Sequence, residues 1–140
     1  MKRHSALDHR TLAFWAADCA EHVLRLLDDE SLKDGRCRAA IEAARAWGRG
    51  EMTVAKAREA AFAAHAAARE SIVPAACAVA RSTGHAAATA HVAEHARHAA
   101  AYAIKAVEAA MTADGSSNAN ANNERIWQQR QLDKSRPSSH

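Results

Sequence analysis

The sequence predicts an all-α fold, and three observations support this. Alanine, the strongest helix former, accounts for 39 of the 140 residues. Aromatic residues, which strands favour, make up only 4% of the chain, and β-branched residues are also few. Apolar side chains recur every three or four positions, which is the period of a helix with one buried face. We therefore expect a single-domain antiparallel array of about five helices, with a C-terminal helix and a flexible tail.

The first two expected helices are separated by an acidic turn. Asp8 is a good N-cap residue, and a first helix is expected from there to about Leu27. The turn DDESLKDG follows it. A second helix is expected over residues 36–47, ending where Gly48 and Gly50 interrupt the pattern.

Three further helices are expected before the composition changes. Thr53 caps a third helix over residues 54–70, and Pro74 suits the first turn of a short fourth helix ending near Gly84. The fifth, over residues 85–111, is the longest, at about 40 Å. The larger apolar side chains are expected to anchor the alanine-rich core: Leu12, Phe14, Trp15, Val23, Leu26, Ile41, Trp47, Phe62, Ile72, Val92 and Val107.

The composition changes after residue 112, which sets the expected domain organisation. Residues 1–112 form the helical domain. Residues 113–123 are small, polar and aperiodic, so a flexible linker is expected there. Residues 124–134 regain helical spacing and are expected to form a C-terminal helix, while residues 135–140 are expected to be a disordered tail.

Charge and cysteine content limit the function classes. The net charge of +3 is small for a nucleic-acid-binding protein and is not gathered into one patch. No apolar stretch is long enough to span a membrane, and the N-terminal region lacks the pattern of a secretory signal. Cys19, Cys37 and Cys77 are far apart and odd in number, which favours a reducing compartment. We expect a cytoplasmic protein that binds neither nucleic acid nor membranes.

The charges around the acidic turn are unevenly placed. Asp28, Asp29 and Glu30 follow the end of the first expected helix, and Arg36 and Arg38 open the second, so both ends oppose the helix dipole. In one account these opposite charges pair across the turn and contribute about 0–1 kcal/mol per pair. In the other, the three acids form an exposed lip that meets a basic partner. The five residues are therefore a candidate partner-binding site.

A second candidate site lies on the fifth expected helix. On a continuous helix, His91, His95, His98, Tyr102 and Lys105 fall on one stripe beside the apolar seam. The stripe is compatible with a metal site, a pH-sensitive contact or the rim of a partner surface. Alternatively, some of its histidines are neutral and hydrogen-bonded between helices, while others face water.

His91 and His95 are the candidate metal ligands. The segment His91-Val-Ala-Glu94-His95 matches H-x-x-E-H, in which two helical histidines hold zinc. A catalytic zinc site also needs a third ligand and an open position, and the sequence does not place a third ligand here. Nine histidines also make a chance match easy. Because no nucleophile or phosphate-binding motif occurs either, we expect no enzymatic activity and no cofactor, with zinc as the alternative.

Several segments resemble a known protein family. They are LAFWAADCAEHVL (12–24), DGRCRAAIEAARAWGRGE (34–51), AREAAFAAHAAARE (57–70), GHAAATAHVAEHA (84–96), AAYAIKAV (100–107) and ERIWQQRQL (124–132). Together they resemble the immunity proteins found with bacterial polymorphic toxin systems. One departure is Cys37, where the family pattern has proline.

The resemblance implies a small all-helical protein that protects its producer cell by binding a cognate protein toxin. It implies no catalytic residues. The alternatives are a histidine-rich metal-binding protein and a structural or oligomerising helical module, in which the partner is a second copy of the chain.

Overall fold

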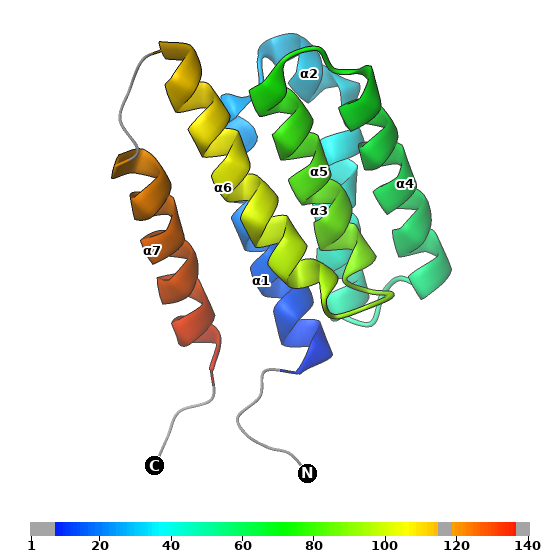
Figure 1. The fold of residues 1–140 in the computed structure, drawn as a ribbon. Helices are drawn as coiled ribbons and strands as arrows, with labels where there is room; N and C mark the ends of the chain where they lie inside the picture. The colour runs from blue at the N-terminus through cyan, green and yellow to red at the C-terminus, as the bar shows by residue number, and fades with distance from the viewer. Residues whose placement is uncertain (1–7, 115–118, 137–140) are drawn as a thin grey trace.

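The computed structural model describes residues 8–114 and 119–136, and these form the predicted all-α fold (Figure 1). The described residues contain seven α-helices, one 3-10 turn and no strand. The elements are α1 (His9–His22), η1 (Leu24–Leu26), α2 (Asp29–Asp34), α3 (Arg36–Gly48), α4 (Val54–Glu70), α5 (Pro74–Ala88), α6 (His95–Asp114) and α7 (Ala119–Ser135). None of these helices is both long and apolar enough to cross a membrane.

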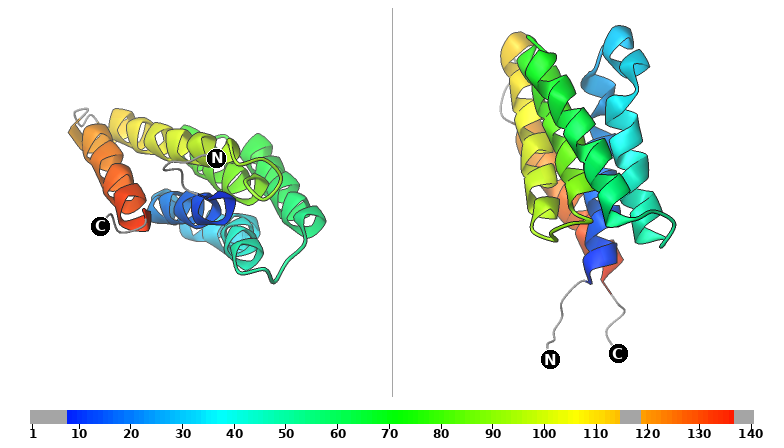
Figure 2. Two further views of the ribbon diagram at one scale, coloured as in Figure 1. Left: turned by 90° about the horizontal axis from the view of Figure 1, so that it is seen from below. Right: turned by 90° about the vertical axis from the view of Figure 1, so that its right-hand side faces the viewer.

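The body of the molecule has two layers of helices. α4, α5 and α6 form one layer, and α1 and α3 form the other (Figure 2). α7 lies beside α1 and α6, and the short α2 lies at the end of the bundle where α3 begins (Figure 1). α5 packs against α1, α3, α4 and α6, so it is the central helix.

The composition of α5 explains its central position. Ten of its 15 residues are buried, and most of these are alanine, so neighbouring helices can approach its backbone closely. Its partly exposed residues include Cys77, Arg81, His85 and Ala88, spaced four, four and three apart. That spacing places them on one outward stripe of the helix.

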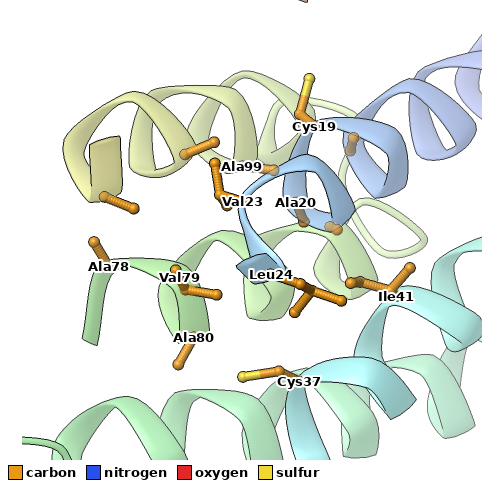
Figure 3. Close-up of a cluster of buried hydrophobic side chains, with 14 of the residues drawn as sticks. Cys19, Ala20, Val23, Leu24, Cys37, Ile41, Ala78, Val79, Ala80 and Ala99 are labelled. Carbon is orange, nitrogen blue, oxygen red and sulfur yellow. The ribbon is translucent and has the colours of Figure 1, made fainter. Parts of the chain in front are cut away.

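Medium-sized side chains fill the space between the layers. Ile41, Val23, Val79 and Val107 are the largest apolar side chains that are fully buried. Figure 3 shows Ile41, Val23 and Val79 in this cluster, with alanine and cysteine around them. Since alanine buries little area, the core depends on many close helix contacts.

The predicted helix starts are confirmed at three caps. The Asp8 carboxylate accepts a hydrogen bond from the Thr11 amide at 2.7 Å. The Thr53 hydroxyl oxygen accepts one from the Lys56 amide at 3.1 Å. Pro74 lies in the first turn of α5, where its missing N–H leaves no hydrogen bond unmade.

Three of the expected core anchors are wrong. Phe62 is 61% exposed, Ile72 is 96% exposed and Val92 is 42% exposed. Phe62 lies on the outer side of the edge helix α4, where the Arg58 guanidinium is 5.7 Å from its ring centre. Ile72 and Val92 lie in the connections before and after α5.

The expected helix over residues 85–111 is also wrong, because the chain breaks after Ala88 and α6 begins only at His95. The Thr89 hydroxyl donates to the carbonyl oxygen of His85, which competes with continuation of the helix. His9 Nε2 donates to the Thr89 carbonyl oxygen and ties the break to α1. The reversal allows α5 and α6 to pack along each other, which an uninterrupted helix could not do.

The helices extend into the range that was expected to be a linker. α6 continues to Asp114 and α7 begins at Ala119, so the linker predicted over 113–123 is too long and the C-terminal helix begins before residue 124. Residues 115–118 lie outside the described part of the chain. Of the tail predicted over 135–140, Ser135 belongs to α7, and residues 137–140 lie outside the description.

α7 is fixed to the body largely by polar contacts. The Trp15 indole N–H donates to the backbone oxygen of Gln128 at 2.9 Å, and the Gln128 side-chain amide donates to the Ala100 carbonyl oxygen at 2.9 Å. The His22 ring stacks on Trp127 with a centroid separation of 3.6 Å and also contacts the buried Glu124 carboxylate at 2.8 Å. These contacts compensate for the weak amphipathicity of a helix whose sequence is mostly polar.

The burial pattern predicts unequal effects for two large apolar side chains. Ile41→Ala should lower the free energy of unfolding by about 2–5 kcal/mol, because Ile41 is only 1% exposed and its removal leaves a cavity. Phe62→Ala should change it by less than about 0.5 kcal/mol, because this ring already faces water. Urea unfolding of both variants measures the difference. Equal losses would contradict this description of the core.

Candidate functional site

The outward stripe of α5 meets histidines from both neighbouring helices. The ring centroid of His85 lies 5.0 Å from that of His65 on α4. It lies 5.1 Å from that of His95 and 5.2 Å from that of His98, both on α6. Because α5 lies between α4 and α6 (Figure 1), three helices contribute to one group of rings. We call His65, His85, His95 and His98 the histidine cluster.

An aromatic and cationic edge continues the cluster along α6. The Tyr102 ring stacks on His85, with centroids 5.3 Å apart and an interplanar angle of 10°. The Lys105 ammonium lies 4.9 Å from the centre of the Tyr102 ring, within cation–π range. His98 and Lys105 are exposed, so the edge of the cluster is open to solvent.

A glycine allows the closest approach in the cluster. The His65 ring lies over Gly84 of α5, and a Cβ atom at this position would be only 2.7 Å from two of the ring atoms. Any side chain here would therefore displace the imidazole. Gly84 sets the depth at which His65 packs between α4 and α5.

The hydrogen bonds of the cluster require at least two unprotonated Nδ1 atoms. Arg81 donates to His65 Nδ1 at 2.9 Å, and since a guanidinium has no acceptor, this nitrogen must carry no proton. His85 Nδ1 and His95 Nδ1 are 2.9 Å apart, so one of them donates and the other accepts. If all three rings were protonated, each ring nitrogen that now accepts a hydrogen bond would carry a proton and would face another donor.

The surroundings favour these neutral forms. Burial, followed by the charges of the neighbouring histidines, lowers the pKa of His85 to about 4. Burial also lowers the pKa of His65, and Arg81 adds to this effect. The pKa of His95 is lowered by burial and by His98 and His91, with Glu94 acting in the opposite direction. The rings of His65, His85 and His95 are therefore mainly uncharged at neutral pH.

The predicted stripe is only partly correct. His95, His98, Tyr102 and Lys105 lie together on α6, but His91 lies in the exposed connection between α5 and α6. The H-x-x-E-H segment is thus not on one helix, and the helical spacing that placed His91 and His95 toward one zinc ion does not exist. Among the side chains that the structure describes, no three histidine, cysteine or acidic residues are arranged to hold a metal ion.

The acidic turn is a helix, so the expected clash of its acids with a helix dipole is wrong, whereas Arg36 and Arg38 do open α3 against its dipole, as expected. The Asp28 carboxylate caps α2 by accepting from the Ser31 amide at 2.8 Å, and this bond lowers its pKa. Asp29 and Glu30 occupy the first turn of α2, where negative charge is favourable. Gly35, with a φ of 83°, ends α2 and lets α3 begin at once. Asp28, Asp29 and Glu30 are exposed, and none forms an ion pair with another described residue.

Arg36 confirms that opposite charges pair here, although with other partners than expected. Its guanidinium binds both oxygens of Asp34, at 2.7 and 2.8 Å, and also the Glu70 carboxylate at 2.7 Å. These bonds tie the start of α3 to the end of α4 and lower the pKa values of Asp34 and Glu70. Arg38 is exposed and has no ion pair within the described residues. Arg36 therefore has a structural role, whereas Arg38 remains available to a partner.

A groove of about 240 Å³ opens beside these charges. Its lining combines apolar side chains with carboxylates from α2 and α4. The lining includes Leu27, Glu30, Asp34, Arg36, Ala67 and Glu70. Next to it, Ile72 and Val73 are 96% and 52% exposed. We call Asp28–Glu30, the groove and these two apolar residues the charged end.

The comparisons with known proteins place the chain in a family. A family model described as "Imm-5 like putative immunity protein" matches residues 2–135. The chain belongs to this family. Comparison with curated proteins gave no match, and comparison with solved structures gave none either.

In this immunity-family chain, two of the segments that resemble the family have clear structural roles. The segment WAADCA contributes the buried Trp15 and Cys19 to α1, and burial raises the pKa of the Cys19 thiol. The segment beginning at Gly84 supplies the contact with His65 and the break after α5. Cys37, the departure from the family pattern, is a buried free thiol in the first turn of α3.

Sequence reasoning missed part of both sites. His65 and His85 are not among the candidate residues that the sequence predicts, yet both belong to the cluster. Asp34 and Glu70 were not expected to bind Arg36. The Gly84-His85 pair was a usable signal for close helix packing. The contacts between α4, α5 and α6, however, join residues that no regular spacing in the sequence connects, so the sequence pattern does not reveal them.

The cluster predicts that acid weakens the fold. His85 has an ordinary pKa of 6.5 when unfolded and about 4 when folded, so the unfolded chain binds more protons between these values. Stability should be constant above about pH 6.5 and fall as the pH decreases toward about 4. Urea midpoints across this range provide the measurement. His85→Gln should show a shallower decrease, whereas the exposed His91→Gln should follow the wild type; identical profiles for all three would refute the assignment.

Proposed function

We propose that the protein is a non-catalytic immunity protein that binds and neutralises a cognate toxin of a bacterial polymorphic toxin system in the cytoplasm. The family match over residues 2–135 carries this proposal. An immunity protein must recognise one protein tightly, and a rigid helical body with exposed charged and aromatic groups suits that task.

The chemistry of the described residues supports binding rather than catalysis. The thiols of Cys19 and Cys37 are buried, and burial raises their pKa values, which disfavours the reactive thiolate. The three cysteines of the chain are free, which fits a reducing cytoplasm. His65 bonds to Arg81 and His85 bonds to His95, and among the described residues no serine or cysteine is hydrogen-bonded to these imidazoles.

Two surfaces are the proposed contacts with the toxin. The first is the edge of the histidine cluster, with His95, His98, Tyr102 and Lys105, together with His91 in the adjoining connection. The second is the charged end with the exposed Arg38. Exposed apolar groups at Ile72 and Val73 add the kind of anchor that protein interfaces bury.

The proposed role predicts stoichiometric protection. Toxin activity should decrease linearly with added protein and vanish at equimolar amounts, because a binder blocks one toxin molecule at a time. The assay uses a toxin identified by co-purification with this protein, with purified protein titrated into it and with co-expression to test cell survival. Protection at a small fraction of the toxin concentration would indicate catalysis, and no protection by excess protein would contradict the proposal.

The same assay tests the two surfaces. His95→Ala and Asp29→Lys should each weaken the complex about tenfold or more without changing the far-UV circular dichroism, because His95 is only partly buried and Asp29 is exposed, so neither change leaves a cavity in the core. Glu42→Lys, a charge change on the exposed side of α3, is the matched control and should bind normally. Wild-type affinity in both test variants would show that the contacts lie elsewhere.

A further inference from the structure

We propose that the histidine cluster, with Arg81 and Lys105, is a docking surface for an acidic segment of the protein partner, and that this surface takes up protons when the segment binds. The proposal rests on the proposed function, since the partner in question is the toxin. It adds the chemistry of the contact: carboxylates on the partner, and imidazoles and cations on this chain.

Uncompensated positive charge surrounds the cluster. Arg69, Arg81 and Lys105 form no ion pair with a carboxylate in the described residues; Arg81 bonds to His65, and Lys105 lies over Tyr102. The charged and titratable groups that face the cluster are Arg69 with His65 on α4, Arg81 with His85 on α5, His91 and Glu94 in the connection, and His95, His98, Tyr102 and Lys105 on α6. Glu94 is the one carboxylate among them, and Arg97 already binds it.

The hydrogen-bonding capacity of the cluster also points to an acceptor-rich partner. His65 uses Nδ1 as an acceptor, and His85 and His95 share one proton between their Nδ1 atoms. The groups that remain for a partner are therefore largely donors: the Arg81 guanidinium, the Lys105 ammonium and ring N–H groups. A carboxylate accepts from several such donors at once and is the natural complement of this surface.

Binding of carboxylates would reverse the electrostatics that keep the rings neutral. The low pKa values of His65, His85 and His95 arise from burial and from neighbouring positive groups. A carboxylate brought next to the rings favours their charged forms and raises these pKa values. By linkage, the complex binds more protons than the free protein, so affinity increases as the pH decreases.

The surface is also physically suited to be an interface. Phe62 on α4 and Val92 in the connection before α6 are exposed, so apolar groups occur on the same layer of helices. The charged end, at the other end of α5, carries mainly exposed carboxylates and would suit a basic partner. The two surfaces can therefore be distinguished by the charge of the ligand they accept.

The test uses the full-length protein and a peptide of ten glutamates, with ten lysines as the opposite probe. Imidazole and backbone resonances are followed by NMR in low salt, and affinities and proton uptake are measured by calorimetry in buffers of different ionisation enthalpy. We expect decaglutamate to shift the resonances of His85, His95 and Tyr102, to take up protons, and to bind about fivefold more tightly at pH 6 than at pH 8.

Three variants separate the proposal from general charge effects. Lys105→Glu should weaken decaglutamate binding about fivefold or more, whereas Lys33→Glu, the same charge change on α2, should not. His85→Gln should retain binding at pH 8 but lose most of the pH dependence. Decaglutamate shifts confined to other surfaces, pH-independent binding, or decalysine shifting the cluster would each overturn the proposal. Since no toxin is used, such a failure leaves the protection assay unaffected, and a failed protection assay leaves this result standing.

Discussion

The close approach of neighbouring helices to α5 is the constraint on which the rest of the structure depends. Alanine side chains bury little area, so this core gains stability only if backbones come near one another over long stretches. α5 achieves this on most of its circumference, with α1, α3, α4 and α6 around it. Even its polar residues serve the packing: the buried Ser82 hydroxyl donates to the Ala99 carbonyl oxygen of α6 at 2.7 Å.

Close packing of small residues also explains why Phe62 lies outside the core. There is little room for a phenylalanine between helices that touch through alanine, and Phe62 accordingly lies on the outer side of α4. Planar rings pack along the outward stripe of α5, and the absence of a side chain at the neighbouring Gly84 leaves space for the ring of His65. The histidine cluster is thus a consequence of the same packing that forms the core.

Local signals in the sequence were sufficient for some elements and misleading for others. The bounds of α4 agree with the prediction because Thr53 caps its start and the alanine pattern stops at Glu70. The break before α6 could not be predicted, since residues 89–94 contain no glycine or proline and continue the helical spacing. It arises from tertiary contacts, in particular the bond from His9 to Thr89. Likewise, Asp28 was expected in a turn that follows the first helix, whereas it caps the start of α2, because polar residues such as aspartate occur both in turns and at helix N-caps.

The break has a direct effect on the candidate site. On the continuous helix that the sequence favoured, His85 and His95 would be separated by about 15 Å along the axis and could not touch. Because the chain reverses between them, their Nδ1 atoms are 2.9 Å apart, and His65 joins them from α4. The reversal removes His91 from the group and with it the basis for a helical zinc motif. The reversal instead brings imidazoles from three helices into contact, and the protonation of these imidazoles is coupled to the packing of the helices.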